Sequence, residues 1–361
     1  MKKIISFFAF FVLVSFLLSP FISLILPDSL RDHTYREIIM HVVASEETRG
    51  LKSEAEIAKK LFFYTAKNTL VNPGGLVPYE DKALGYLING LVYCDYASDI
   101  LAVLCAHKGI PARYCMLKDK NDISPHTIVE IFLNGKWRVF DPTEVCYYTN
   151  KSGELATIED LSHDPALIFA NKRMQKIKET SPAAYVEMVE NYKKIFPLPF
   201  PPQRSSSKIK RITLPDRVGF FYYFLFGNNF LKFYQNIYLK IKTRDMDKKE
   251  CIYYVSRNFH LVHRSKKAIQ GYSEFIKSYP EDANSDKVIL FLALIYMDQK
   301  RDYLKAPNVL ATLASKPGNI YQRYALYYIG KCLEFLNKKE QAQEYFNKSG
   351  MFIRLDPSLA N

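Results

Sequence analysis

The sequence lacks paired cysteines and any recognisable nucleic-acid-binding module. Its six cysteines stand singly, at positions 94, 105, 115, 146, 251 and 332, with no CxxC spacing. This spacing argues against a structural zinc site or a redox dithiol. His260 and His263 can share a helix face, but the further ligands that a metal would need are missing. We therefore expect no metal, no cofactor and no nucleic-acid partner.

Charged side chains are missing from residues 4–26, which follow Lys2 and Lys3. An apolar helix of this length can cross a hydrocarbon core of about 30 Å. No convincing cleavage site precedes Pro27, and the two lysines favour a cytoplasmic N-terminus. We expect residues 1–27 to form an uncleaved signal-anchor, a single transmembrane helix that leaves the rest of the chain in the periplasm or at the cell surface. A cleaved signal peptide is the alternative.

The net charge of +13 is concentrated in one part of the chain. Residues 50–165 contain 12 Lys and Arg against 15 Asp and Glu, whereas residues 166–260 contain 18 against 7. The basic part is either an ordinary solvated surface or one that is attracted to anionic lipid or to an anionic cell-envelope polymer.

A cysteine stands at the start of a predicted helix in the acidic part. Apolar residues recur at helical spacing after Cys94, at positions 97, 100, 101, 104 and 105, so a buried helix is expected to begin close to it. The free N–H groups and the positive dipole end of a helix start favour thiolate over thiol. Cys105 lies on the apolar face and is expected to be a core residue.

A histidine and an aspartate lie on a predicted β-hairpin. Residues 126–133 and 136–141 flank Asn134-Gly135, the dipeptide most typical of a two-residue hairpin turn. In that register Asp141 lies opposite Ile128, which makes His126 its diagonal neighbour at roughly 7–8 Å. The hairpin is therefore expected to hold the imidazole and the carboxylate within reach of each other.

The order Cys94, His126, Asp141 predicts a nucleophilic triad. Taken singly, each residue has a simpler explanation: a packing cysteine, a hydrogen-bonded histidine and an aspartate in a turn. Together they suit a reaction in which His126 activates the thiol and protonates the leaving group while Asp141 fixes the imidazole tautomer. A nucleophilic Cys94 must stay free, so we expect few or no disulfides among the remaining five cysteines.

Five short blocks resemble the transglutaminase-like superfamily. They are Gly-Leu-Val-Tyr-Cys-Asp-Tyr-Ala (90–97), Gly-Ile-Pro-Ala-Arg (109–113), His-Thr-Ile-Val-Glu-Ile (126–131), Lys-Trp-Arg-Val-Phe (136–140) and Asp-Pro-Thr (141–143). The resemblance covers roughly residues 50–150 and implies a papain-like α+β domain with Cys94, His126 and Asp141 as its catalytic triad. It also implies attack of the thiolate on an amide carbonyl to give a thioester.

The resemblance leaves open what resolves the thioester. Water makes the protein a cysteine peptidase or amidase, and an amine makes it a cross-linking acyltransferase. No calcium-loop pattern is visible and bacterial members of the superfamily are more often hydrolases, so we favour hydrolysis of a protein or peptide. An amidase that acts on cell-wall peptides would suit the basic region, residues 166–260. The competing hypothesis is a non-catalytic protein-binding scaffold.

The segment before Cys94 is expected to frame the site. Ser53 and Glu56 match a capping box at the start of a helix. The run Asn72-Pro73-Gly74-Gly75 ends that helix and opens a loop of about 20 residues that could line a substrate groove.

The C-terminal third repeats a pattern of paired helices. Ala268, Ala306 and Ala342 are 38 and 36 residues apart, each inside an apolar helical pattern. The pattern resembles divergent tetratricopeptide repeats, in which small residues let two helices pack closely and the array binds a peptide or protein. A plain helical bundle is the alternative.

The region between these two parts is expected to connect them. A helix is expected over residues 181–195, and the proline-rich run at 197–202 is the clearest linker. Residues 220–241 are aromatic and apolar with interleaved lysines, which suits either a helix that packs on the next domain or one that lies in a membrane interface.

The predicted fold class is thus an α+β papain/transglutaminase-like domain followed by an all-α repeat region, after an N-terminal transmembrane helix. The predicted divisions are the signal-anchor (1–27), the catalytic domain (45–165), a helical extension with linker (166–249) and the repeats (250–361).

Overall fold

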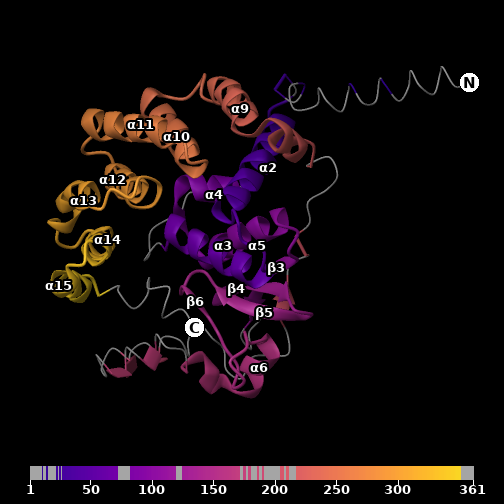
Figure 1. Ribbon diagram of the computed structural model, residues 1–361, viewed down its shortest axis with the longest axis vertical. Coiled ribbons are helices and arrows are strands. Elements are labelled where there is room, and N and C mark those ends of the chain that lie inside the picture. Colours follow the sequence, from indigo (N-terminus) through magenta and orange to yellow (C-terminus); the bar gives the residue numbers. More distant parts are fainter. Residues whose placement is uncertain are drawn as a thin grey trace, which may run out of the picture.

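The computed structural model describes residues 27–71, 82–118, 124–170 and 217–350. It also describes single residues and short pieces at 10, 14, 22, 24–25, 174–175, 178–179, 185–186, 189–190, 204–206 and 209–210. Residues 28–170 form a mixed domain of helices and strands, and residues 248–349 form a helical array beside it (Figure 1). A mixed domain followed by a helical region agrees with the predicted order of an α+β domain and an all-α region.

A five-stranded antiparallel sheet is the base of the mixed domain. Its strands are β3 (Ala112–Leu117), β4 (His126–Leu133), β5 (Lys136–Asp141), β6 (Cys146–Tyr147) and β7 (Arg204–Ser206), in the order β6-β5-β4-β3-β7. Asn134 and Gly135 join β4 to β5 with positive φ angles of 52° and 78°, as the predicted two-residue turn requires. The predicted register is confirmed, since Val129 pairs with Phe140.

Helices cover both faces of this sheet. They are α2 (Asp28–Glu47), α3 (Glu54–Asn68), α4 (Ala83–Asn89), α5 (Cys94–His107), α6 (Ile158–His163) and the short η1 (Pro165–Ile168). Helix α5 lies on β3 and β4, with α2 and α3 packed against its outer side (Figure 1). The opposite face, including Ile128 and Val139, packs on α6 in a smaller apolar cluster. A short parallel pair, β1 (Leu70–Val71) and β2 (Leu91–Val92), joins the end of α3 to the start of α5.

The helical array is a curved stack of helix pairs (Figure 1). Its elements are α10 (Lys248–Leu261), α11 (Ser265–Ser278), α12 (Ser285–Leu294), η2 (Ile295–Gln299), α13 (Lys305–Ala314), α14 (Gln322–Phe335) and α15 (Lys339–Ser349). The three predicted alanines, Ala268, Ala306 and Ala342, are all buried. At Gly330 an added Cβ would lie 2.6 Å from the ring of Phe346, so α14 and α15 approach closely because the residue is small.

Helix α9 (Arg217–Lys242) connects the array to the mixed domain. It is broken at Gly227, whose φ of 52° and ψ of −136° are not helical. Its second half packs on α2, where the rings of Tyr238 and Tyr35 stack with centroids 3.5 Å apart. Apolar side chains of the array and of α2, α3, α4 and α5 belong to one continuous buried cluster. The helical array is therefore packed firmly against the mixed domain.

Two expectations for the segment before Cys94 are wrong. Helix α3 begins after Ser53 as predicted, but the Ser53 side chain makes no capping hydrogen bond. The first part of the expected loop, residues 72–81, lies outside the described residues, and the part that follows contains α4 and β2. Helix α4 escaped prediction because five of its seven residues are buried, so it shows no division into a polar and an apolar face. The proline-rich linker and most of the 181–195 helix fall outside the described residues.

The transmembrane helix predicted over residues 1–27 requires correction. Among the described residues, no helix is long and apolar enough to cross a membrane. Helix α2 carries Arg31, Asp32 and Glu37, and α9 carries Lys232 and a break, all of which are costly in hydrocarbon. Residues 4–26 lie mostly outside the described part of the chain. The periplasmic or cell-surface location rested on that helix and stays a prediction.

Candidate active site

The imidazole of His126 and the carboxylate of Asp141 are in contact at one end of the sheet. His126 is the first residue of β4 and Asp141 the last of β5, and His126 Nε2 lies 2.7 Å from Asp141 Oδ2. Both side chains are buried, His126 being 4% exposed and Asp141 0%. The hairpin register explains the contact, because it makes the two residues diagonal neighbours on adjacent strands.

Asp141 is oriented by the turn that follows it. Its Oδ1 accepts the backbone N–H of Thr143 at 3.1 Å and that of Glu144 at 3.0 Å. Aspartate often accepts hydrogen bonds from the backbone just ahead of it, which stabilises a turn. With Oδ1 occupied in this way, Oδ2 is the oxygen that faces His126.

Cys94 is the first residue of α5, after Tyr93 at the N-cap. Its backbone N–H has no helical carbonyl four residues earlier, and it lies at the positive end of the helix dipole. Its side chain is half-buried and hydrogen-bonds to His126. Since Asp141 occupies Nε2, Nδ1 is the ring nitrogen left for the thiol. The structure thus brings all three predicted site residues together.

A buried serine fastens the first turn of α5 to β4. The hydroxyl of Ser98, one turn after Cys94, donates to the carbonyl of Thr127 at 3.2 Å. Thr127 follows His126, so this bond sets the distance between the helix start and the strand start. Sequence reasoning missed Ser98 because a single serine in an apolar helix carries no signal of its partner.

The surroundings of His126 favour its protonated form. Burial alone would lower the pKa of His126, because it disfavours a charged ring. The charge and hydrogen bond of Asp141, together with the contact to Cys94, outweigh burial and hold the pKa of His126 well above its usual value. A protonated imidazole beside a cysteine stabilises the thiolate, which is the nucleophilic form of the side chain.

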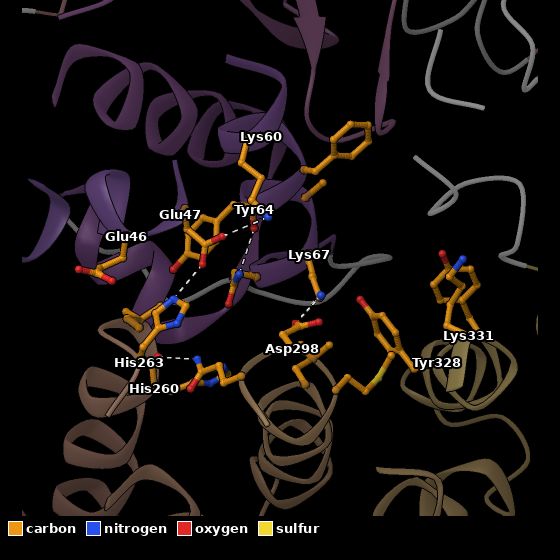
Figure 2. A pocket seen from close by; sticks show the side chains of 18 of the residues that line it. Glu46, Glu47, Lys60, Tyr64, Lys67, His260, His263, Asp298, Tyr328 and Lys331 are labelled. Carbon is orange, nitrogen blue, oxygen red and sulfur yellow. Dashed lines mark hydrogen bonds and ion pairs between the residues drawn. The ribbon is translucent and has the colours of Figure 1, made fainter. Parts of the chain in front are cut away.

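A cavity of about 650 Å³ lies between α3 and the helical array (Figure 2). Ion pairs cross between its two walls. Glu47 of α2 bonds to His263 at 2.9 Å, and Lys67 of α3 pairs with Asp298 of η2. Aromatic rings line the rest, including those of Tyr64, Tyr303, Tyr327, Tyr328 and Phe335. The lining is therefore aromatic with charges of both signs.

One polar group in this cavity is buried without a bond. The hydroxyl of Tyr64 has no hydrogen-bond partner among the described residues, and the residue is 8% exposed. A buried polar group left unpaired costs about 1–3 kcal/mol. The cavity also reaches Val145, the residue after Glu144, whose N–H holds Asp141. Cys94, His126 and Asp141 are not themselves among the lining residues.

The two histidines considered as metal ligands bond to other side chains instead. His260 contacts Arg257 and His263 bonds to Glu47. Within the described residues, no three His, Cys, Asp or Glu side chains gather where they could hold a metal ion. All six cysteines are free.

Comparison with known proteins agrees with the resemblance seen in the sequence. Residues 42–142 match the family model of the transglutaminase-like superfamily, and residues 324–349 match that of the tetratricopeptide repeat. Neither the curated proteins nor the solved structures gave a match. The chain therefore carries a transglutaminase-like core over residues 42–142 and a tetratricopeptide repeat over residues 324–349.

Proposed function

We propose that the protein is a cysteine hydrolase that cleaves amide bonds through Cys94, His126 and Asp141. The observation that carries the proposal is the buried His126 ring, which bonds to the Asp141 carboxylate on one side and to the Cys94 side chain on the other. This is the arrangement that nucleophilic catalysis by a thiol requires: a nucleophile, a base within hydrogen-bond reach and a third group that orients the base.

The proposed reaction has two steps. His126 takes the thiol proton, the Cys94 sulfur attacks the carbonyl carbon, and the C–N bond breaks as the His126 ring gives that proton to the leaving amine. Water then gives a proton to His126 and attacks the thioester carbonyl carbon. The C–S bond breaks, the acid is released, and His126 returns the proton to the Cys94 sulfur, which restores the thiol. The backbone N–H of Cys94 is the proposed donor to the oxyanion of each tetrahedral intermediate.

A polypeptide is the proposed substrate class, because it suits the cavity beside α3, which reaches Val145 but is not lined by the three catalytic residues. The cavity beside α3 has a size typical of ligand sites, roughly 300–1,000 Å³. Its aromatic walls suit apolar side chains, and its mixed charges and the Tyr64 hydroxyl suit the donors and acceptors of a peptide chain. Tetratricopeptide repeats are protein-interaction modules, which supports a protein or peptide as the partner of the array.

Mapped alkylation tests the role of Cys94. The full chain is treated with iodoacetamide near neutral pH, and each cysteine is followed by peptide mass mapping. We expect Cys94 to react faster than Cys251, which is also half-buried, and His126→Ala to slow Cys94 without slowing Cys251. Equal rates at the two cysteines in the wild-type protein would overturn the proposal.

Incubation with a peptide library, with and without a primary amine, identifies the acceptor. Cleaved peptides in both conditions indicate hydrolysis, whereas amine-linked products indicate an acyltransferase. Cys94→Ala should abolish either product.

A second candidate function is a non-catalytic scaffold, which the cavity and the matched repeat favour. In that case the wild-type protein and Cys94→Ala would bind the same peptides equally, and neither would give a product.

A further inference from the structure

The helical array caps the helix that leads into Cys94. Helix α4 ends at Asn89, and the carbonyl groups of its last turn have no N–H partners within the helix. The hydroxyl of Tyr253, on α10, lies 2.8 Å from the carbonyl oxygen of Ile88 and 2.9 Å from that of Asn89, so the two carbonyls share its one proton. One hydroxyl of the array therefore bonds at the C-terminal end of a helix of the mixed domain.

Arg257, one turn later on α10, completes the cap. It is fully buried, and its Nε donates to the carbonyl of Leu87 at 3.0 Å. Its Nη2 donates to the carbonyl of Asn68, the last residue of α3, at 3.1 Å. The guanidinium thus lies at the C-terminal ends of two helices, where the dipoles favour a positive charge. It also stacks 3.8 Å from the ring centre of Phe291.

Gly90 continues the contact towards the site. Its φ of 77° ends α4 in the left-handed conformation, and an added Cβ would lie 2.4 Å from Cζ of Phe291. Only glycine satisfies both the backbone angle and this close approach. Beyond it, the two residues of β2 and then Tyr93 lead directly to Cys94.

We infer that Tyr253 and Arg257 are positioning residues for Cys94, so that docking of the helical array sets the reactivity of the thiol. The inference rests on the proposed function. Only three residues, all extended, separate Gly90 from Cys94, and a shift of the α4 cap is passed along them. Ser98 holds the rest of the first α5 turn on β4, so such a shift changes the contact between Cys94 and His126.

The same cap borders the cavity. Asn68 and His260 both line the cavity, and both bond to Arg257, through Nη2 at 3.4 Å and Nη1 at 3.0 Å. A polypeptide held there would contact the partners of Arg257. Binding in the cavity and reactivity at Cys94 are in this way connected through one buried guanidinium.

The test uses the full chain and two variants of the cap. Tyr253→Phe removes only the hydroxyl and keeps the ring, and Arg257→Gln removes the charge and the forked donors. Alkylation of Cys94 by iodoacetamide is measured over a range of pH, with the melting temperature in parallel. We expect Arg257→Gln to slow alkylation by roughly tenfold or more and Tyr253→Phe by a smaller factor, because misplacement of a reacting group by about 1 Å can cost up to 100-fold. The pH profile should shift in both.

A matched control removes a hydroxyl at a different junction. Tyr238→Phe deletes the bond from α9 to Asp32 of α2, 3.0 Å long, and a bond to Tyr254 of α10, but it leaves the α4 cap intact. It should therefore leave Cys94 alkylation and its pH profile unchanged. Wild-type rates and profiles in both cap variants would overturn the inference, and so would an equal loss in Tyr238→Phe. If Arg257→Gln does not fold, the rate and pH profile of Cys94 alkylation in Tyr253→Phe alone test the inference. An unreactive Cys94 in the wild-type protein would instead overturn the proposed function.

Discussion

His126 and His260 are buried to nearly the same degree, 4% and 5% exposed, yet their pKa values move in opposite directions. His126, in the mixed domain, faces the Asp141 carboxylate, which holds its pKa well above the usual value. At His260, in the helical array, burial and then the positive charge of Arg257 lower the pKa well below that value. Burial alone favours a neutral histidine, and at His126 the Asp141 carboxylate and the contact with Cys94 reverse this.

The difference separates a group suited to chemistry from one suited to structure. A protonated His126 has a proton to give to a leaving group and stabilises a thiolate. A neutral His260 is an acceptor, and its Nδ1 lies 3.0 Å from Nη1 of Arg257. The same side chain therefore serves the proposed reaction in one region and the cap of α4 in the other.

Asp141→Asn should make His126 resemble His260, because it removes the carboxylate that distinguishes the two histidines. Of the variants considered, it has the largest expected effect on activity. The amide can keep Oδ1 on the backbone N–H groups of Thr143 and Glu144 but presents an NH₂ to His126 Nε2. The ring must then accept at Nε2 and carry its proton on Nδ1, the wrong tautomer to deprotonate Cys94. We expect turnover of a cleaved peptide to fall on the order of 10³–10⁴-fold.

The pH dependence of the same variant gives an independent check. Without the carboxylate, burial dominates and the pKa of His126 falls, so the imidazolium is lost at lower pH than in the wild-type protein. NMR titration of the His126 ring measures this directly. Near-wild-type turnover, or an unchanged His126 titration, would contradict the role given to Asp141. The melting temperature should change little, because the backbone bonds are kept.

Whether a contact could be predicted from the sequence depends on how far apart its two residues lie along the chain. The turn at Asn134-Gly135 set the β4–β5 register, and with it the contact of His126 and Asp141, because all four residues are close in sequence. The cap of α4 joins Tyr253 to Ile88, 165 positions apart, and a tyrosine in a helix carries no sign of such a partner. Helix α4 itself has no two-faced pattern. Local rules thus predicted the contact of His126 with Asp141, whereas the contact of the array with α4 required the structure.

His260→Leu should affect stability rather than chemistry, with an intermediate effect. It removes the ring nitrogen that accepts from Arg257 Nη1 and that lies 3.2 Å from the hydroxyl of Tyr272. We expect a loss of about 1–3 kcal/mol in the free energy of unfolding, measured with urea. A loss below the error of the measurement would show that the ring is not needed as an acceptor.

The sign of the pH dependence distinguishes this residue further. Below about pH 6.5 the unfolded chain protonates a histidine that the folded protein keeps neutral, so stability falls as the pH drops. His260→Leu should reduce this slope. Part of the pH dependence of stability should remain in this variant because of His41. Burial lowers the pKa of His41 to about 3, so this ring too is neutral in the folded protein where the unfolded chain protonates it. An equal slope in variant and wild type would contradict the buried, neutral state of His260.

His263→Asn should have the smallest effect on stability. It extends the comparison of His126 with His260 to a histidine that has a carboxylate partner but is not deeply buried. Its ring lies 2.9 Å from Glu47, and its side chain is 37% exposed. Asparagine tolerates the φ of 59° at this position, so the variant removes the ion pair without adding backbone strain. Glu47 keeps its ion pair with Lys60, 3.6 Å away.

We expect His263→Asn to lower the free energy of unfolding in urea by less than about 1 kcal/mol. The loss should be smaller still at high salt, because exposed pairs are solvated and screened. Alkylation of Cys94 should not change. A loss as large as that of His260→Leu would mean that a carboxylate partner stabilises a histidine strongly even in contact with water, and that burial is not what sets His126 apart.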